Sequence, residues 1–289
     1  MEPRLPSTVC LRVTRYCNAR CRFCLAPPDG VHPSADILKQ RVDWLAKHGV
    51  RTIHFCGGEP TIHPGLPALL SHAQARGCAT RLTTNGIVLP DALLSALRAN
   101  GTEVKLSLHG DRMHHDTIVG RPAFDLATQH LHSLMSGGVS ATVQTTVIAG
   151  AEWVLDWMAD YCLAHGVRRL SILPFIPRGN GYRVQGEYGL TTTQRGELRE
   201  RVRRKRHALQ GRLDVRWLDF ASKSLHVVEA DGRVVLERAS EAMDTVLGAI
   251  PEEMVARKRV PMKAAVQAAP GTTAHLRWKP RDLFDVMQL

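Results

Sequence analysis

The sequence lacks the features that mark several other classes of protein. No run of eighteen apolar residues occurs among its 289 residues, which argues against a membrane-spanning helix. The first residues, MEPRLP, lack the apolar segment of a secretory signal peptide, and we expect a cytoplasmic protein without a membrane partner. Only seven cysteines are present, and without a signal peptide they do not suggest a disulfide framework.

Acidic residues are too few to balance the basic ones, because 27 Asp and Glu face 38 Lys and Arg, which gives a net charge of +11. Basic clusters attract phosphate, so a nucleic-acid partner has to be considered. The densest basic segment, residues 195–216, carries a narrow apolar stripe of Leu198, Val202 and Leu209, which is typical of a helix with a solvated charged face. No basic patch with interleaved aromatics accompanies it. We therefore do not expect a nucleic-acid partner, although the charge does not exclude one.

Three of the seven cysteines are clustered as Cys17-x3-Cys21-x2-Cys24, just after the first strand-like segment. Three thiolates can hold three irons of a cubane cluster and leave the fourth iron open for a ligand. The same spacing would put three structural cysteines on one helix face, although Pro27 and Pro28 would stop such a helix. A structural zinc site is the other alternative, but it usually takes four ligands, and no second C-x2-C or H-x3-H pair follows.

Four segments together resemble one enzyme family. Residues 17–24, CNARCRFC, are similar to the C-x3-C-x-aromatic-C signature of the radical S-adenosylmethionine (SAM) enzymes, with Phe23 at the aromatic position. The segments GGEP (57–60), LTTNG (82–86) and LSLHG (106–110) resemble further motifs of this family at the ends of its second, third and fourth strands. The resemblance implies an enzyme that uses a [4Fe-4S] cluster to cleave SAM reductively. The product would be a 5'-deoxyadenosyl radical that abstracts hydrogen from a substrate.

Strand-like and helix-like segments alternate with short connections, which indicates a parallel sheet wound with helices. The expected strands are residues 9–13, 52–56, 79–84, 103–108, 140–147 and 169–173, and the expected helices are 37–48, 66–76, 91–99, 125–135 and 153–165. The α/β pattern agrees with the partial (β/α)6 TIM-like barrel that the resemblance implies. We predict that residues 1–180 form this core.

Residues 181–289 are predicted to form a C-terminal α+β extension. It should contain a basic helix over about residues 192–210 and a hairpin over residues 227–236, with a two-residue turn at Asp231-Gly232. Residues 240–289 have no confident fold and are expected to be a cap over the barrel or a tail.

The resemblance assigns cofactor roles to residues at the ends of the expected strands, where barrel enzymes collect their reactive groups. Cys17, Cys21 and Cys24 would ligate the cluster. The implied SAM contacts are Phe23, Gly57, Gly58, Glu59, Pro60, Thr84, Asn85, Ser107, Gln144 and Leu173. The two glycines would allow close backbone approach, and Glu59 or backbone carbonyls would accept hydrogen bonds from the SAM ammonium group. For the polar residues, capping or turn roles are the alternative.

Candidate substrate contacts lie on loops over the expected barrel mouth, namely His109, His115, Arg121 and Arg178. Arg178 is expected to bind an anionic group, whereas Asp116 is expected to begin a helix. No cysteine follows Cys162, which argues against an auxiliary cluster. We therefore expect a small-molecule substrate, such as a natural-product or nucleotide-derived intermediate, and an electron donor such as a flavodoxin or ferredoxin. The alternatives are the same chemistry on a peptide or RNA, and a cysteine-ligated metal protein without catalysis.

Overall fold

The computed structural model describes residues 5–218, 220 and 223–251. Strands and helices alternate as the sequence predicts. The elements are β1 (Thr8–Arg12), α1 (Ala35–Lys47), β2 (Thr52–Cys56), η1 (Pro60–Ile62), α2 (Leu66–Ala75), β3 (Ala79–Thr84), α3 (Asp91–Ala99), β4 (Glu103–Ser107), α4 (Arg112–Val119), α5 (Phe124–Ser136), β5 (Ala141–Val147), α6 (Val154–Ala164), β6 (Arg169–Pro174), η2 (Gly179–Val184), α7 (Gln185–Tyr188), α8 (Thr192–Ala208), β7 (Asp214–Trp217), β8 (Leu225–Val228), β9 (Arg233–Glu237), η3 (Glu241–Met243) and β10 (Thr245–Ala249).

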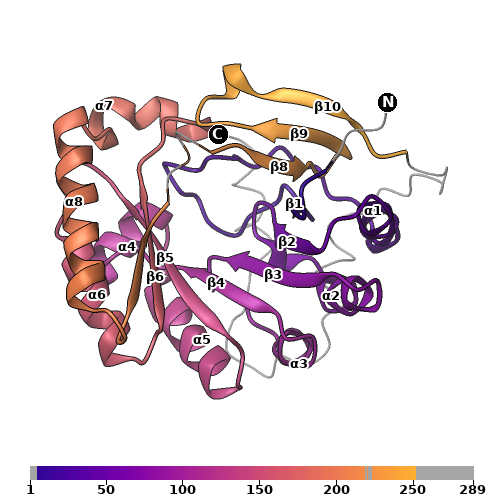
Figure 1. Cartoon of the computed structure of the whole chain (residues 1–289), viewed down its shortest axis with the longest axis horizontal. Coiled ribbons are helices and arrows are strands. Elements are labelled where there is room, and N and C mark those ends of the chain that lie inside the picture. The colour runs from indigo at the N-terminus through magenta and orange to yellow at the C-terminus, as the bar shows by residue number, and fades with distance from the viewer. Residues whose placement is uncertain (1–4, 219, 221–222, 252–289) are drawn as a thin grey trace. The chain divides into compact units, whose positions relative to one another are not determined.

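The strands of the described residues form one ten-stranded sheet in the order β10-β9-β8-β1-β2-β3-β4-β5-β6-β7. Strands β1 to β7 pair in parallel with their neighbours along the chain, and β8 is parallel to β1. The pairs β8–β9 and β9–β10 are antiparallel. Figure 1 shows α1, α2, α3, α5, α6 and α8 around the outside of the curved sheet. The fold is the predicted α/β partial barrel.

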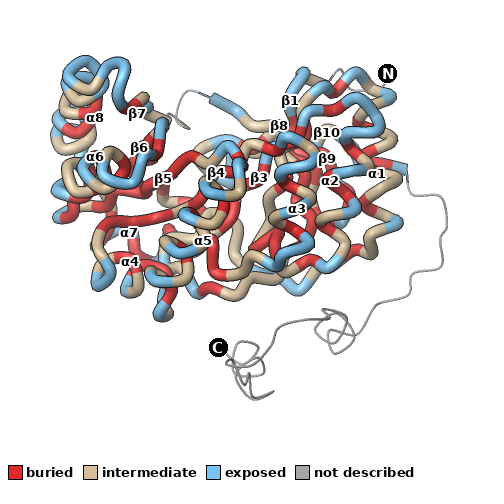
Figure 2. Tube along the Cα trace, turned by 90° about the horizontal axis from the view of Figure 1, so that it is seen from below, coloured by how far each residue is buried: buried red, intermediate tan, exposed pale blue. Residues whose placement is uncertain are grey.

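Alternation along the strands separates an apolar face from a polar face. In β2, Ile53 and Phe55 are fully buried, whereas His54 between them is partly exposed. Strand β4 repeats the pattern, with Lys105 between two fully buried residues. Because successive side chains of a strand point to opposite faces, the apolar set packs under the helices and the polar set lies on the concave face. Figure 2 shows that the buried residues concentrate in the strands and the helix surfaces next to them.

The structure differs from the sequence expectations in several elements. Helix α4 and strands β7 and β10 were not expected. The hairpin of β8 and β9 is present, but the predicted two-residue turn is wrong, because Val228 pairs with Val234 and residues 229–232 connect the strands. The N–H of Gly232 donates to the Glu229 carbonyl (2.9 Å), and Gly232 has a φ of 92°. The Asp-Gly pair therefore ends a longer turn, which satisfies the same glycine preference.

Residues of the predicted extension add strands to both edges of the barrel sheet, since β7 pairs with β6 and β8 with β1. Helix α8 begins with a capping box between Thr191 and Gln194. Its Arg201 (2.6 Å) and Lys205 (2.8 Å) pair with Asp156 of α6, while several of its other basic residues face solvent as expected. Most of the predicted cap or tail, residues 252–289, lies outside the described residues.

Candidate active site

The three clustered cysteines lie in the loop between β1 and α1, and all three are free thiols. Backbone hydrogen bonds attach this loop, residues 13–34, to other segments. The N–H of Arg20 donates to the carbonyl of Val119, the last residue of α4 (2.9 Å), and the N–H of Asn180 in η2 donates to the Cys24 carbonyl (2.9 Å). The cysteines are therefore held in place by segments that follow β4 and β6.

The three thiols share a partly buried environment, and no cation lowers the pKa of Cys17 or Cys21. Burial raises the pKa of Cys17 to about 12, with the charge of Glu59 as the next cause. Burial also raises the pKa of Cys21, and the neighbouring Cys24 and Cys17 raise it further. Thiols that influence each other in this way lie close together, and a positively charged group among them would favour their thiolate forms.

Amide groups beside Cys17 complete this environment. The Nδ2 of Asn18 is buried without a hydrogen-bond partner in the described part of the chain, while its Oδ1 accepts from Asn85 Nδ2 (2.7 Å). Asn85 Nδ2 also lies 4.0 Å from the Cys17 Sγ. An unsatisfied buried donor beside three thiols suits a group with sulfur acceptors, as an iron–sulfur cluster has.

A site for a single metal ion would need a different arrangement of ligands from a site for a cluster. Among the described residues, no three His, Cys, Asp or Glu side chains are arranged to hold one metal ion. Two thiolates on one zinc lie within about 4.6 Å of each other, because each Zn–S bond is about 2.3 Å. Thiolates that bind different irons of a cluster can be farther apart. This finding therefore concerns single-ion sites and leaves the cluster interpretation in place.

The Gly57-Gly58 pair lies directly against the start of the cysteine loop. The N–H of Gly58 donates to the Thr14 carbonyl and the N–H of Glu59 to the Tyr16 carbonyl, both at 2.8 Å. A Cβ on Gly58 would lie 2.0 Å from the Tyr16 oxygen, and one on Gly57 2.4 Å from the Thr14 oxygen. We expected the two glycines to let a ligand approach the backbone. In the structure, another segment of the same chain makes this close approach.

Glu59 connects the second and third motifs. Its side chain is buried, and Oε1 accepts hydrogen bonds from the Thr61 N–H (3.0 Å) and from the hydroxyls of Thr61 and Thr84 (both 2.7 Å). Oε2 accepts from the Asn85 N–H (2.7 Å). Burial raises the pKa of Glu59, and these hydrogen bonds oppose the rise. Four internal donors thus occupy the carboxylate that was expected to meet the SAM ammonium, while Pro60 begins η1 behind it.

The remaining predicted cofactor contacts lie on β4, β5 and β6, with Ser107 and Leu173 at or next to the carboxyl ends of their strands and Gln144 in the middle of β5. Ser107 is paired in register with Gln144, so their side chains lie on the same, concave face. Leu173 is buried and paired with Thr146. The structure therefore brings a hydroxyl, an amide and an apolar side chain to one edge of the sheet.

Two histidines stack behind the aromatic residue of the cysteine motif. His109 Nδ1 accepts from the Thr146 N–H, and His115 Nδ1 accepts from the His109 N–H, both at 3.1 Å. Burial lowers the pKa of both, that of His115 to about 4, so both rings are neutral with the proton on Nε2. The ring of Phe23 packs edge-on against His109 with centroids 5.3 Å apart.

The other predicted substrate contacts are engaged within the protein. Arg121 Nη1 donates to the Asn18 carbonyl (2.7 Å), which fixes the cysteine loop. Arg178 is buried and pairs with Asp244 (2.6 Å) and Glu237 (3.1 Å), so this placement favours a structural role over binding of an anionic ligand. Asp116 does not begin a helix as expected, because it lies within α4, whose N-cap is Asp111. Its Oδ1 instead accepts the N–H groups of residues 123 and 124 at the start of α5.

Sequence reasoning missed the ion pairs under the cysteine loop. Arg12, at the end of β1, is buried and pairs with Glu229 and Glu237. A charged residue ending an apolar strand was the available signal, but its partners are more than 200 positions away. The structure also brings together Cys10 and Cys56, which look isolated in the sequence. Interaction with the Cys56 thiol lowers the pKa of Cys10, and the pKa of Cys56 is raised in turn.

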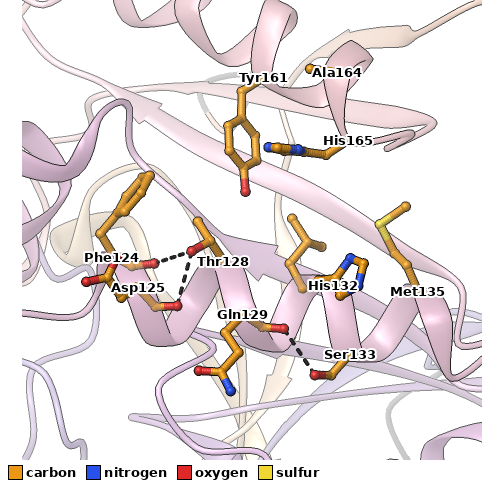
Figure 3. A pocket seen from close by; sticks show the side chains of 11 residues that line it. Phe124, Asp125, Thr128, Gln129, His132, Ser133, Met135, Tyr161, Ala164 and His165 are labelled. Carbon is orange, nitrogen blue, oxygen red and sulfur yellow. Dashed lines mark hydrogen bonds between the residues drawn. The ribbon is translucent and has the colours of Figure 1, made fainter.

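A hollow on the surface lies away from the predicted site residues. It has a volume of about 900 Å³ and lies between α5 and α6 on the outer helical layer. Figure 3 shows side chains of both helices, such as Thr128 and Tyr161, turned toward it. None of the residues that line it is among the predicted site residues. We assign the chemistry to the strand ends, where the motifs converge.

Comparisons with known proteins place the chain among relatives of one superfamily. Residues 11–153 match the family model of the Radical SAM superfamily. Fe-coproporphyrin III synthase of Methanosarcina barkeri is 31% identical over 181 residues, which cover 61% of this chain and 45% of that protein. PqqA peptide cyclase of Streptomyces rochei is 27% identical over 212 residues, which cover 71% and 58%. The chain thus spans about half the length of these curated relatives.

A solved structure shows the same fold. The structure of anSMEcpe with bound AdoMet superposes with a TM-score of 0.71 and 16% sequence identity, covering 86% of this chain and 80% of that one. Separately, no helix in the described part of the chain is both long and apolar enough to cross a membrane.

Proposed function

Because the chain belongs to the radical SAM superfamily, we propose that it is an enzyme that binds a [4Fe-4S] cluster through Cys17, Cys21 and Cys24 and cleaves SAM reductively. The observation that carries the proposal is the attachment of the cysteine loop to the GGEP and TTNG segments through Gly58 and Glu59. When bound, the cluster supplies the electron that releases a 5'-deoxyadenosyl radical from SAM, for hydrogen abstraction from a substrate.

The chain's own residues hold and orient the reactants. The cysteine thiols must lose their protons to become ligands, and because burial raises their pKa, loading should release protons at neutral pH. The carboxylate of Glu59 is occupied by internal donors, so we assign it to fixing the two motifs and assign the SAM ammonium to backbone carbonyls of residues 57–60. Ser107 and Gln144 offer polar groups to SAM.

Apolar contacts and proton positions complete the proposed site. Phe23 and Leu173 offer apolar surface to the adenine. His109 has its Nδ1 occupied by the Thr146 N–H, so only its Nε2–H remains to donate to a substrate oxygen. His115 orients His109 through the backbone hydrogen bond and is a positioning residue rather than a catalytic one.

The proposal also includes the class of the substrate and the electron donor. The relatives named above include a coproporphyrin synthase and a peptide cyclase, and we propose a small molecule as the substrate of this chain. We further propose a cytoplasmic, oxygen-sensitive enzyme with a flavodoxin or ferredoxin as reductant. The net charge of +11 is compatible with an acidic protein donor.

Anaerobic reconstitution with iron and sulfide tests the proposal. The wild-type chain should bind about four irons and four sulfides and, with dithionite and SAM, should release 5'-deoxyadenosine. Cys21→Ala should fail in both assays. Cys162→Ala is the matched control, because this thiol is buried in α6 on the helical layer. Equal iron content and equal 5'-deoxyadenosine in Cys21→Ala and Cys162→Ala would contradict the assignment.

A further inference from the structure

A small cavity lies on the concave face of the sheet, separate from the residues assigned to the cluster and SAM. Its volume of about 140 Å³ has room for several water molecules or a small ionic group. The residues that line it come from β2, β3, β4, β6 and the β7 segment, and are His54, Arg81, Leu82, Glu103, Lys105, Arg169, Ser171, Arg216 and Leu218. Four of these nine residues are lysine or arginine and one is acidic, so the cavity carries an excess of positive charge.

The amino-terminal ends of the strands carry a ladder of alternating charges at this cavity. Glu103 pairs with Arg81 (3.3 Å) and with Arg169 (2.9 Å). Asp214 pairs with Arg169 (3.1 Å) and with Arg216 (2.7 Å). Three arginines thus share two carboxylates, and the ladder alone has one positive charge in excess.

Lys105 adds a second excess charge and has no partner of its own. It lies on β4 two residues beyond Glu103, on the same face of the strand. Its ammonium makes no ion pair or hydrogen bond with any residue that the structure describes. Burial lowers the pKa of Lys105, and the negative charges of Glu103 and Cys10 only partly oppose this, while Arg81 and Arg169 lower it further. Lys105 is half-buried, and a partly desolvated ammonium without a partner is unfavourable unless an anion compensates it.

The position of Lys105 relates the cavity to the proposed reaction. Glu103, Lys105 and Ser107 alternate along β4, and each residue of a strand advances by about 3.3 Å. An anion on Lys105 would therefore lie about 7 Å along the strand from Ser107, the proposed SAM contact. That distance is within the length of a small metabolite.

We propose that Lys105, together with Arg81, Arg169, Arg216 and Ser171, forms a binding site for an anionic group, a phosphate or a carboxylate, inside the barrel. That this group belongs to the substrate rests on the proposed function, whereas the site itself does not. The substrate would then be a small organic anion whose charged end enters the barrel and whose reacting carbon faces the carboxyl ends of the strands.

Thermal unfolding of the full chain with simple anions tests the site. Sodium phosphate and sodium acetate are compared with sodium chloride at equal ionic strength, since phosphate also stabilises proteins without specific binding. The variant is Lys105→Met, and the control is Lys47→Met, an exposed lysine at the end of α1. The wild type and Lys47→Met should gain a saturable rise in Tm with one or both anions. Lys105→Met should need about ten-fold more anion or show no saturable rise, because a hydrogen bond to a charged group contributes on that order.

A measurement on the wild type covers the case in which Lys105→Met does not fold. Lysine acetylation mapped by mass spectrometry should show that phosphate or acetate slows modification of Lys105 several-fold and leaves Lys47 unchanged. The stronger of the two anions identifies the class of the bound group. An equal saturable rise in wild type and Lys105→Met, or no protection of Lys105 by either anion, would overturn the site. A chain that binds anions at Lys105 but forms no 5'-deoxyadenosine would overturn the proposed function and leave the site standing.

Discussion

Replacing Gly58 by alanine should displace the cysteine loop. The new Cβ would lie 2.0 Å from the Tyr16 carbonyl oxygen and 2.6 Å from its carbon. Because carbon and oxygen normally approach to about 3.3 Å, the two segments must separate by about 1.3 Å. The hydrogen bonds from the N–H groups of Gly58 and Glu59, now both 2.8 Å, would then exceed 4 Å and be lost.

The expected loss of stability in Gly58→Ala follows from the loss of those two hydrogen bonds. Each lost bond that leaves a buried donor unsatisfied costs about 1–3 kcal/mol, so Gly58→Ala should lower the free energy of unfolding by about 3 kcal/mol. For a chain of this size that corresponds to a fall in Tm of about 6–12 °C. Cys17 follows Tyr16 directly, so iron content after anaerobic reconstitution should fall as well. Circular dichroism melts and iron analysis give the two readouts.

Gly196→Ala is the control for this substitution. Gly196 lies within α8, and an added Cβ would meet no atom within 4 Å. Alanine is favoured over glycine in a helix by about 1 kcal/mol, so this variant should be slightly more stable than the wild type and should load iron normally. A Gly58→Ala protein that melts within 2 °C of the wild type and binds the same iron would refute the reasoning.

Two further predictions concern titration and a buried ion pair. Burial lowers the pKa of His115 to about 4, whereas the unfolded chain takes up this proton near 6.5, so the wild type should lose up to about 3 kcal/mol of stability as pH falls from 6.5 to 4. Urea melts of His115→Gln should show a smaller loss over this range, and an unchanged pH slope would contradict the burial argument. Arg178→Met leaves Asp244 without its cation and should lower the free energy of unfolding by about 3 kcal/mol in urea melts. Adding Asp244→Asn should restore part of it, and a double variant no more stable than Arg178→Met would count against the pair.

The fold and the cysteine loop could be predicted because their signals are local in the sequence. The spacing of Cys17, Cys21 and Cys24 falls within eight residues, and each strand–helix unit shows its own apolar period. Helix α4 escaped prediction because its eight residues carry few apolar side chains. Strand β7 has only four residues, so it gave little periodic signal.

The roles of individual polar residues were less accessible, because they depend on pairings across the chain. Glu59 and Asn85 are 26 positions apart, and no local sequence pattern shows that the Asn85 N–H donates to the Glu59 carboxylate. Arg178 looked suited to an anionic ligand by its place after β6, but its acids come from residues about 60 positions later. A sequence motif gives the type of group at a strand end, whereas the partner that occupies the group is set by tertiary structure.

The ion pairs of Arg12 and Arg178 give the C-terminal extension a structural role in the site. Arg12 ends β1, five positions before Cys17, and Arg178 follows β6, while the acid they share, Glu237, ends β9. Both arginines are mostly buried, and a buried cation that loses its partner is strongly destabilising. A chain cut at residue 180 would keep the four motifs but leave both arginines without these acids. The strands of the extension are therefore part of what positions the cysteine loop, and the minimal folded site extends beyond the residues that carry the motifs.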